Sequence, residues 1–377
     1  MNQVGWDVLA ASIERLPAGE IIDSFDVAKA AAARGASAIL VPHGFDGGRR
    51  RLPELALFDR ELFDLGYIRL KPEFAEAAGA EAGQGTLYVR SDLLVRLDWL
   101  ANPPEDAVVQ ISYFRNLGRF ANRMFMYSNL ILYRLRSCCR VEIPAWEEAE
   151  LFPVALPAPS EVLPQQTFAP FHGSERHLLH LDDPMIGVDF FAYFQELTSQ
   201  HTRHKAFIRR LLTPSGYYTG AINEWLAEEV PAGSTLVALH VRRGDYLNYG
   251  DSPWFRAIPV EWYLEWLPGV LSTIEKPVLY VATDDPENIP PRFAEYNPLI
   301  APVTQLVEPA FSFLVDFHVM RRAKVLAMCN SSFSRMGALL GDDDKEVYIP
   351  NCPEKRFERY DPWADRAFWD RFGPGVA

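Results

Sequence analysis

A histidine, two arginines and an aspartate follow one another at the end of an apolar stretch in the second half of the chain. The segment LVALHVRRGDYLNYGD covers residues 236–251. Alternation of side chains places His240 and Arg242 on one face of the predicted strand, and Arg243 begins the loop. A guanidinium at a strand end is a planar fork that suits a phosphate or a carboxylate. The segment therefore predicts an anion site or, alternatively, an Arg–Asp pair that closes a turn.

Paired carboxylates follow a second apolar run. In LYVATDDP (279–286), Asp284 and Asp285 come directly after the predicted strand. They could cap the next helix, bind a metal, or accept hydrogen bonds from a base or a sugar. The spacing places no third metal ligand, so we expect no metal here.

A third apolar run passes through hydroxyl side chains into a helix. In VLAMCNSSFSRMGALLG (325–341), Asn330, Ser331 and Ser332 lie at that junction. Free N–H groups at a helix N-terminus attract anions, and either serine can also serve as the N-cap, so the two readings are compatible.

The positions of these segments in a regular pattern indicate how they meet. Predicted strands alternate with predicted helices near 260–274, 312–323 and 332–340. The strands are expected at 235–241, 277–283, 299–303, 325–329 and 346–350. This alternation is typical of an α/β fold with a parallel sheet, in which ligands bind at the carboxyl ends of the strands beside a switch point. Arginines, a carboxylate and a helix start at neighbouring strand ends predict a nucleoside-diphosphate site that needs no metal.

Composition limits the classes of partner. The 377 residues are 49% hydrophobic and 23% charged, with a formal net charge of −13 and a pI near 5.2, which argues against a nucleic-acid partner. Four cysteines without a paired spacing favour a reducing, cytoplasmic location. We expect no transmembrane segment and no signal peptide, and peripheral contact with a membrane stays open.

Four motifs resemble the fucosyltransferase superfamily, most closely glycosyltransferase family 11, the α-1,2-fucosyltransferases. HVRRGDY resembles its His-x-Arg-Arg-x-Asp motif, and CNSSFSRMGALL resembles its Asn-Ser-Thr-Phe-Ser-Trp-Trp segment. YVATDDP is similar to a segment of the α-1,6-fucosyltransferases. LGRFANRMFMY (117–127) resembles the opening motif of the family and of the protein O-fucosyltransferases. The motifs lie in order within residues 107–377, and the first hundred residues lie outside the resemblance.

The resemblance implies a GT-B-like fold, with two Rossmann-like domains that face a cleft. The domains are expected at 106–232 on the acceptor side and at 233–352 for the GDP-sugar. Residues 1–105 would form an N-terminal α/β extension of unknown role, and 353–377 a C-terminal helix that packs back. The implied activity is inverting transfer of fucose from GDP-fucose to a glycan or glycoconjugate hydroxyl, with neither cofactor nor metal.

The resemblance also implies roles for residues that bind the nucleotide. Arg242 would hold the β-phosphate, and Arg243 would support it or orient the loop. His240 and Asp284 would contact guanine. The diphosphate would lie against Ser331, Ser332 and the backbone near Phe333.

The remaining implied roles concern the sugar and the proton. Asn122 would reach the donor sugar. Asp245 would be the general base, with Asp251 as the alternative. The family's Gly-Asn-Gln is Ala-Asn-Arg at 121–123, and its paired tryptophans are Arg-Met at 335–336. These departures leave open a different sugar, or a non-catalytic protein that binds nucleotide sugars.

Overall fold

The computed structural model divides the chain into two compact units. Unit 1 comprises residues 1–118 and 125–211, and unit 2 comprises 119–124 and 212–377. The structure describes residues 13–15, 30–42, 59–77, 85–93, 107–168, 179, 185–195, 199–249, 252, 255–363 and 368–372. Asp251 lies outside these described residues, so its predicted role stays a prediction.

Unit 2 is built on a five-stranded sheet in the order β10-β9-β11-β12-β13. The first four strands run parallel, and β13 pairs antiparallel with β12. Their bounds are β9 Thr235–Val241, β10 Pro277–Thr283, β11 Val325–Ala327, β12 Glu346–Asn351 and β13 Arg356–Tyr360. The central strands β9 and β11 are almost fully buried, as their continuous apolar sequences require.

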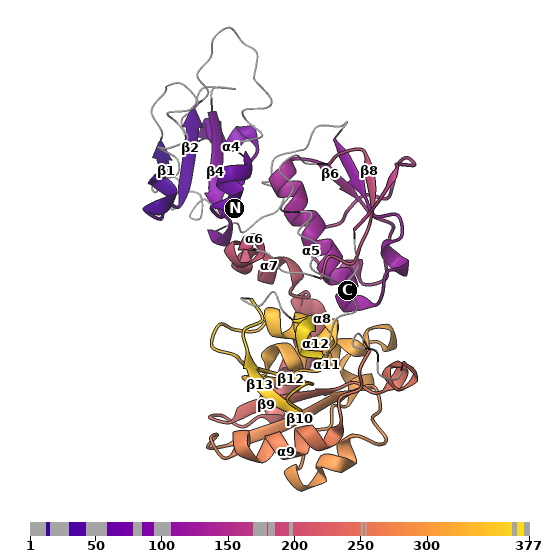
Figure 1. Ribbon diagram of the computed structural model, residues 1–377. Coiled ribbons are helices and arrows are strands. Elements are labelled where there is room, and N and C mark those ends of the chain that lie inside the picture. The colour runs from indigo at the N-terminus through magenta and orange to yellow at the C-terminus, as the bar shows by residue number, and fades with distance from the viewer. Residues whose placement is uncertain are drawn as a thin grey trace. The chain divides into compact units, whose positions relative to one another are not determined.

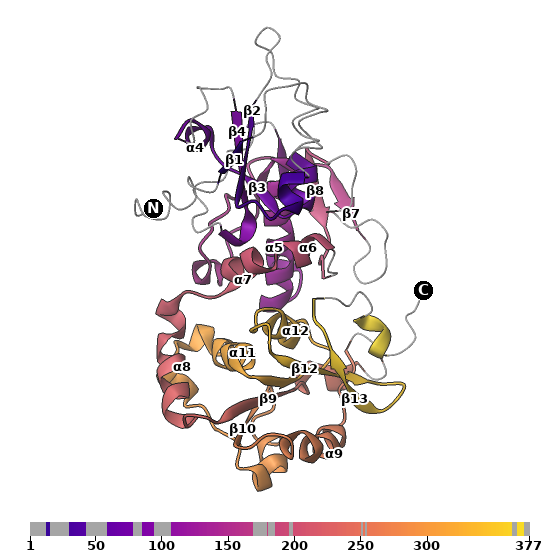
Figure 2. The same cartoon turned by 90° about the vertical axis from the view of Figure 1, so that its left-hand side faces the viewer.

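Helices cover both faces of this sheet (Figures 1 and 2). Helix α9 lies on one face, and α11 and α12 lie on the other. The bounds are α8 Gly216–Glu229, α9 Val260–Leu271, α11 Phe313–Arg322 and α12 Ser332–Leu339. The chain moves outward from β9 to β10 and then returns across β9 to β11, so the strand order reverses between β9 and β11. This is the switch point at which open α/β sheets bind ligands.

Two predicted elements of this region are wrong. The predicted strand at 299–303 is reduced to an isolated bridge between Leu299 and Tyr280. The tail, predicted as a helix, instead forms strand β13 over 356–360, followed by a short 3-10 helix, η9 (Trp369–Phe372). Pairing with β12 decides this outcome, because the exposed edge of β12 satisfies the backbone of the tail. The tail also packs on α12, where the Arg335 guanidinium lies 4.2 Å from the centre of the Phe368 ring.

Unit 1 contains two four-stranded sheets. One is parallel, in the order β6-β5-β8-β7. Its strands are β5 Val108–Gln110, β6 Arg140–Glu142, β7 Gln165–Thr167 and β8 Val188–Phe191. The long helix α5 (Phe120–Ser137) connects β5 to β6. The sequence of residues 187–212 has a helical pattern, but only its second half is helical, as α6 (Ser199–Arg203) and α7 (Lys205–Leu212).

The N-terminal extension forms the other sheet, in the order β1-β2-β4-β3. Its strands are β1 Ile13–Arg15, β2 Ala38–Pro42, β3 Tyr67–Arg69 and β4 Gly85–Arg90, and its helix α4 is Pro72–Ala77. The sequence of residues 52–100 has a helical pattern, yet the structure places strands β3 and β4 within it. The mixed α/β class, with parallel sheets and an additional N-terminal sheet, is confirmed.

Buried polar contacts fasten the extension to the rest of unit 1. The buried imidazole of His204 contacts the carbonyl of Phe63 at 2.9 Å and stacks on its ring. The Arg69 guanidinium donates to the thiol of Cys138 at 2.5 Å and pairs with Asp59 at 2.9 Å. The extension is therefore packed against the residue that follows α5 and the residue that joins α6 to α7.

All four cysteines carry free thiols. Among the residues that the structure describes, no helix is both long enough and apolar enough to cross a bilayer.

Candidate functional site

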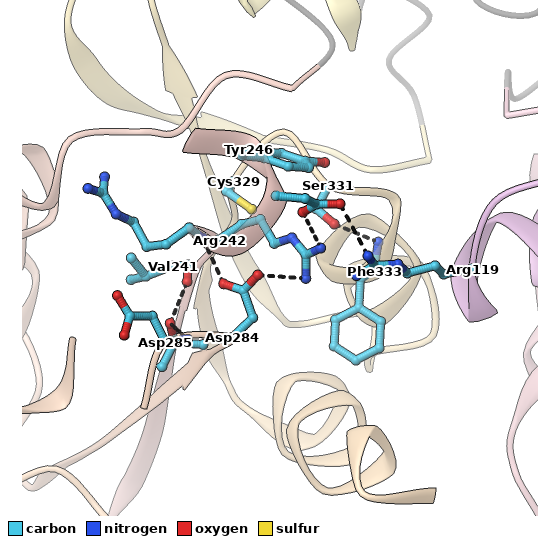
Figure 3. Close-up of polar contacts among 12 residues, drawn as sticks. Arg119, Val241, Arg242, Tyr246, Asp284, Asp285, Cys329, Ser331 and Phe333 are labelled. Atoms are coloured by element: carbon cyan, nitrogen blue, oxygen red, sulfur yellow. Dashed lines mark hydrogen bonds and ion pairs between the residues drawn. The ribbon is translucent and has the colours of Figure 1, made fainter. Parts of the chain in front are cut away.

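Arg242 is held at the carboxyl end of β9 between two carboxylates (Figure 3). Its Nη1 lies 2.9 Å from Oδ2 of Asp284, and its Nη2 donates to Oδ1 of Asp245 at 2.5 Å. The guanidinium also lies 5.3 Å from the centre of the buried Tyr246 ring. Burial opposes the charge of Arg242, but the two carboxylates outweigh it and the pKa is raised. Arg242 is therefore a fixed cation at the switch point.

Asp284 also fixes the loop that follows Arg242. Its Oδ1 accepts from the backbone N–H of Arg243 at 2.7 Å. A Cβ atom added at Gly244 would lie 2.2 Å from Oδ2 of Asp284, so a glycine is required for this close approach. Nearby, the Thr283 hydroxyl donates to the carbonyl of Val241 at 2.7 Å and ties the end of β10 to β9. Both oxygens of Asp284 thus serve to orient the end of β9.

The charge of the Arg243 side chain acts on Glu261. The pKa of Glu261 on α9 is lowered, first by its own backbone N–H and by Arg292, and also by the charge of Arg243. The roles predicted for the Arg243 side chain stay predictions.

The serines lie at the start of α12, beside this cation. Ser331 is the N-cap and accepts from the N–H of Phe333 at 3.3 Å, and Ser332 is the first residue of the helix. The pKa of Tyr246 is raised chiefly by burial, and hydrogen bonding by the Ser331 side chain opposes the rise. The loop after β9 and the start of α12 are therefore in direct contact.

His240 is buried beneath this junction. Its Nδ1 lies 3.2 Å from the Sγ of Cys329, and its ring lies 5.6 Å from that of Phe333. Burial, reinforced by the charge of Arg242, lowers the pKa of His240 to about 3. Burial also raises the pKa of Cys329 to about 12. Both groups are neutral near pH 7, so His240 can offer hydrogen bonds but no charge.

Arg119 joins the cluster, although sequence reasoning gave it no role. Its Nη2 lies 3.2 Å from Oδ2 of Asp245. The next residue, Phe120, packs on the rings of Phe313 and Phe317 at 4.6 and 5.1 Å. Arg119 is the arginine of LGRFAN, so the signal was present in the motif. Asn122 lies in the first turn of α5 and is half-buried, and its contact with a sugar stays a prediction.

Asp316 is a second residue that the motifs missed. This α11 carboxylate accepts from the Tyr280 hydroxyl at 2.5 Å. Burial raises the pKa of Asp316 to about 6; hydrogen bonds from Tyr280 and from the Thr283 backbone oppose the rise, and the charge of Asp284 adds to it. A lone acidic residue inside the otherwise apolar run FLVDFHVM was the available signal.

The structure thus brings together the three strand ends that the sequence singled out. Arg242 and Asp245 follow β9, Asp284 follows β10, and Ser331 follows β11. The arrangement offers a rigid cation, a helix N-terminus and a carboxylate held by two guanidinium groups. Such a site can bind a multiply charged anion and place a carboxylate beside it.

Comparisons with known proteins give distant similarities of structure. No family model and no curated protein matches the chain. Fucosyltransferase NodZ from Bradyrhizobium is similar over 68% of this chain and 99% of its own, at 12% identity and a TM-score of 0.47. POFUT1 in complex with GDP-fucose is similar over 66% of this chain and 99% of its own, at 12% identity and a TM-score of 0.42. A variant of Arabidopsis thaliana FUT1 in complex with GDP is similar over 68% of this chain and 74% of its own, at 12% identity and a TM-score of 0.45.

Proposed function

We propose that this chain is a metal-independent, inverting glycosyltransferase that transfers fucose from GDP-fucose to a hydroxyl of a glycan or glycoconjugate. The observation that carries the proposal is the position of Arg242. It lies at the switch point of a parallel sheet, between Asp245 and Asp284, and beside the start of α12. The choice of fucose rests on the motif resemblance.

Arg242 would bind the diphosphate and stabilise its charge as the sugar departs. The formal charges of the cluster cancel, because two arginines (Arg119 and Arg242) pair with two aspartates (Asp245 and Asp284). A diphosphate would replace Asp245 as a partner of Arg242, while Asp284 keeps the guanidinium oriented. A preorganised cation of this kind contributes about 10²–10³ in rate.

The N-terminus of α12 would supply the second positive element. Ser331 satisfies only the Phe333 N–H, and the helix dipole places partial positive charge at this end. Ser332 and the backbone near Phe333 would then bind phosphate oxygens.

Recognition of the base is proposed for His240 and Asp284. The neutral imidazole of His240 can exchange hydrogen bonds with guanine. Asp284 primarily orients Arg242, and a contact with guanine would use the lone pairs that its bonds to Arg242 and Arg243 leave.

Asp245 would be the general base, with Asp251 as the alternative. The acceptor oxygen forms a bond to the anomeric carbon while the bond from that carbon to the β-phosphate oxygen breaks, and GDP leaves with the electron pair. The hydroxyl proton passes to the carboxylate. When the diphosphate replaces Asp245 as the partner of Arg242, Oδ1 of Asp245 becomes free to accept this proton.

Donor hydrolysis tests the proposal. Release of GDP from GDP-fucose and from GDP-mannose would be measured in EDTA, alongside GDP binding by calorimetry. Turnover of GDP-fucose in EDTA supports the proposal. Turnover of GDP-mannose alone would mean that the transferred sugar is not fucose. GDP binding without turnover of either donor favours a non-catalytic binding protein, and absence of GDP binding removes the nucleotide site.

A further inference from the structure

Exposed apolar side chains lie immediately after the ion-pair cluster. The 3-10 helix η6 (Gly244–Asn248) begins after Arg243. Leu247 and Tyr249 are 53% and 51% exposed, whereas Tyr246 of the same turn is buried. Single exposed apolar residues are ordinary on a protein surface. Leu247 and Tyr249, however, lie on or directly after the same short helix as Asp245, the proposed base, so they are candidates for contact with a substrate.

A chain of aromatic contacts fixes Tyr249 relative to Arg242. The Arg242 guanidinium lies 5.3 Å from the centre of the Tyr246 ring. Tyr246 meets the edge of Phe255 at 5.6 Å and 79°, and Phe255 stacks on Tyr249 at 4.5 Å and 30°. Phe255 therefore covers one face of the Tyr249 ring. The exposure of Tyr249 must come from its other face and its edges.

The bare ring face and the neighbouring carboxylate together suit a sugar. One face of a pyranose carries C–H bonds with partial positive charge, which are attracted to the negative face of an aromatic ring. The hydroxyls at the edge of the same pyranose need acceptors such as a carboxylate. Asp245 lies on the first turn of η6, about 8 Å along the 3-10 axis from Tyr249. A sugar on Tyr249 would therefore lie on the same short helix as the proposed base.

We propose that Tyr249, supported by Phe255, is the platform of an acceptor subsite that binds a saccharide. The inference rests on the proposed transferase function and deepens it, because it assigns the binding of the acceptor to named residues. The subsite continues from the donor site through Tyr246 and Arg242. Tyr249 positions the acceptor and takes no part in proton transfer.

Saturation-transfer NMR on the full chain with bound GDP tests this subsite. The probes are N-acetylchitotriose, lactose, cellobiose and mannotriose. We expect at least one of them to receive saturation from the wild-type protein. Tyr249→Ala should weaken its binding by about three- to tenfold, and Tyr249→Phe should retain it, because the ring face carries the contact. GDP affinity and hydrolysis of GDP-fucose in water should stay within about twofold of wild type.

A matched variant separates the subsite from general effects of removing a tyrosine. Tyr217→Ala removes an 85% exposed tyrosine from α8 and should leave sugar binding unchanged. The inference is overturned if no probe sugar is saturated, or if Tyr249→Ala binds the sugar as well as wild type does. Loss of GDP binding in the wild-type protein would instead overturn the proposed function, so the two failures are distinguishable.

Discussion

The guanidinium of Arg242 and the carboxylate of Asp284 form a pair, 2.9 Å from Nη1 to Oδ2, across two adjacent parallel strands. Their side chains are 17% and 24% exposed, so the pair is shielded from solvent but reachable by a ligand. The same carboxylate holds the Arg243 backbone. The cation of the site therefore depends on the end of the neighbouring strand for its orientation.

Removal of the cation should abolish the proposed activity without unfolding the protein. Arg242→Ala is expected to lower GDP-sugar turnover by about 10²–10³, because a preorganised charge on the leaving group is lost. Steady-state GDP release and thermal unfolding would be measured. Arg292→Ala is the control, since Arg292 pairs with Glu261 at the surface and should cost at most about 1 kcal/mol in stability. Turnover within about threefold of wild type would show that Arg242 has another role.

A methyl group at Gly244 should disturb the site through Asp284. Gly244→Ala would place a carbon 2.2 Å from Oδ2 of Asp284, so the carboxylate must move away from Arg242. Turnover should fall by about tenfold or more. Gly220→Ala, in α8 where no atom lies within 4 Å, should leave turnover unchanged and stabilise the protein by up to about 1 kcal/mol. Equal turnover in both variants would count against the positioning role of Asp284.

Two N-cap serines allow a stability effect to be separated from a binding effect. Ser331 caps α12 and Ser215 caps α8, each accepting an N–H at 3.3 Å. Replacement of either by alanine should cost about 0.5–2 kcal/mol in the free energy of unfolding. Only Ser331→Ala should weaken GDP binding in calorimetry. If both variants bind GDP like the wild type, Ser331 is a cap and nothing more.

Asp316 should make stability depend on pH. Its pKa in the folded protein, about 6, lies above the ordinary value of 3.8. The protonated carboxyl is therefore favoured by folding, and its contribution is complete below about pH 4 and lost as the pH rises through about 6. Relative to Asp316→Asn, the wild type should lose on the order of 1–3 kcal/mol between pH 4 and 7. Denaturant unfolding at several pH values measures the difference.

The pH dependence of the wild type must be compared with that of Asp316→Asn, because His240 changes the stability of the protein with pH in the opposite direction. Its pKa is lowered from 6.5 to about 3, so the folded protein loses stability as the pH falls through that range. Glu287→Gln is the control, because it removes the charge of an exposed carboxylate that follows β10. A flat difference between wild type and Asp316→Asn from pH 4 to 7 would contradict the prediction.

Local sequence predicted the sheet of unit 2 well. The strands at 235–241 and 277–283 have the predicted bounds, because each is a buried apolar run that charged or turn-forming residues end. The tail at 356–360 was missed because RFERY has no local period and becomes a strand only through pairing with β12. The strand at Val188–Phe191 was likewise read as helix, because its neighbour β5 lies about eighty residues away in the sequence.

The candidate site was predicted to the extent that its parts lie at strand ends. The meeting of Arg242, Asp284 and Ser331 follows from the parallel order, which the alternation of elements already indicated. The partnership of Arg119 with Asp245 spans 126 residues and leaves no local pattern. Asp316 stands out in the sequence as an acidic residue in a largely apolar run, but its neighbours Tyr280 and Thr283 are known only once α11 is packed on β10.

The division of helix α5 between the two units has a practical meaning for anyone who dissects this protein. Residues 119–124 belong with unit 2, although they precede its main segment by almost ninety positions. A gene fragment that starts at residue 212 would encode the five-stranded sheet with Arg242 but would omit Arg119, whose guanidinium pairs with Asp245. Truncation would therefore alter the charge balance around Asp245, so the proposed chemistry should be tested on the intact polypeptide.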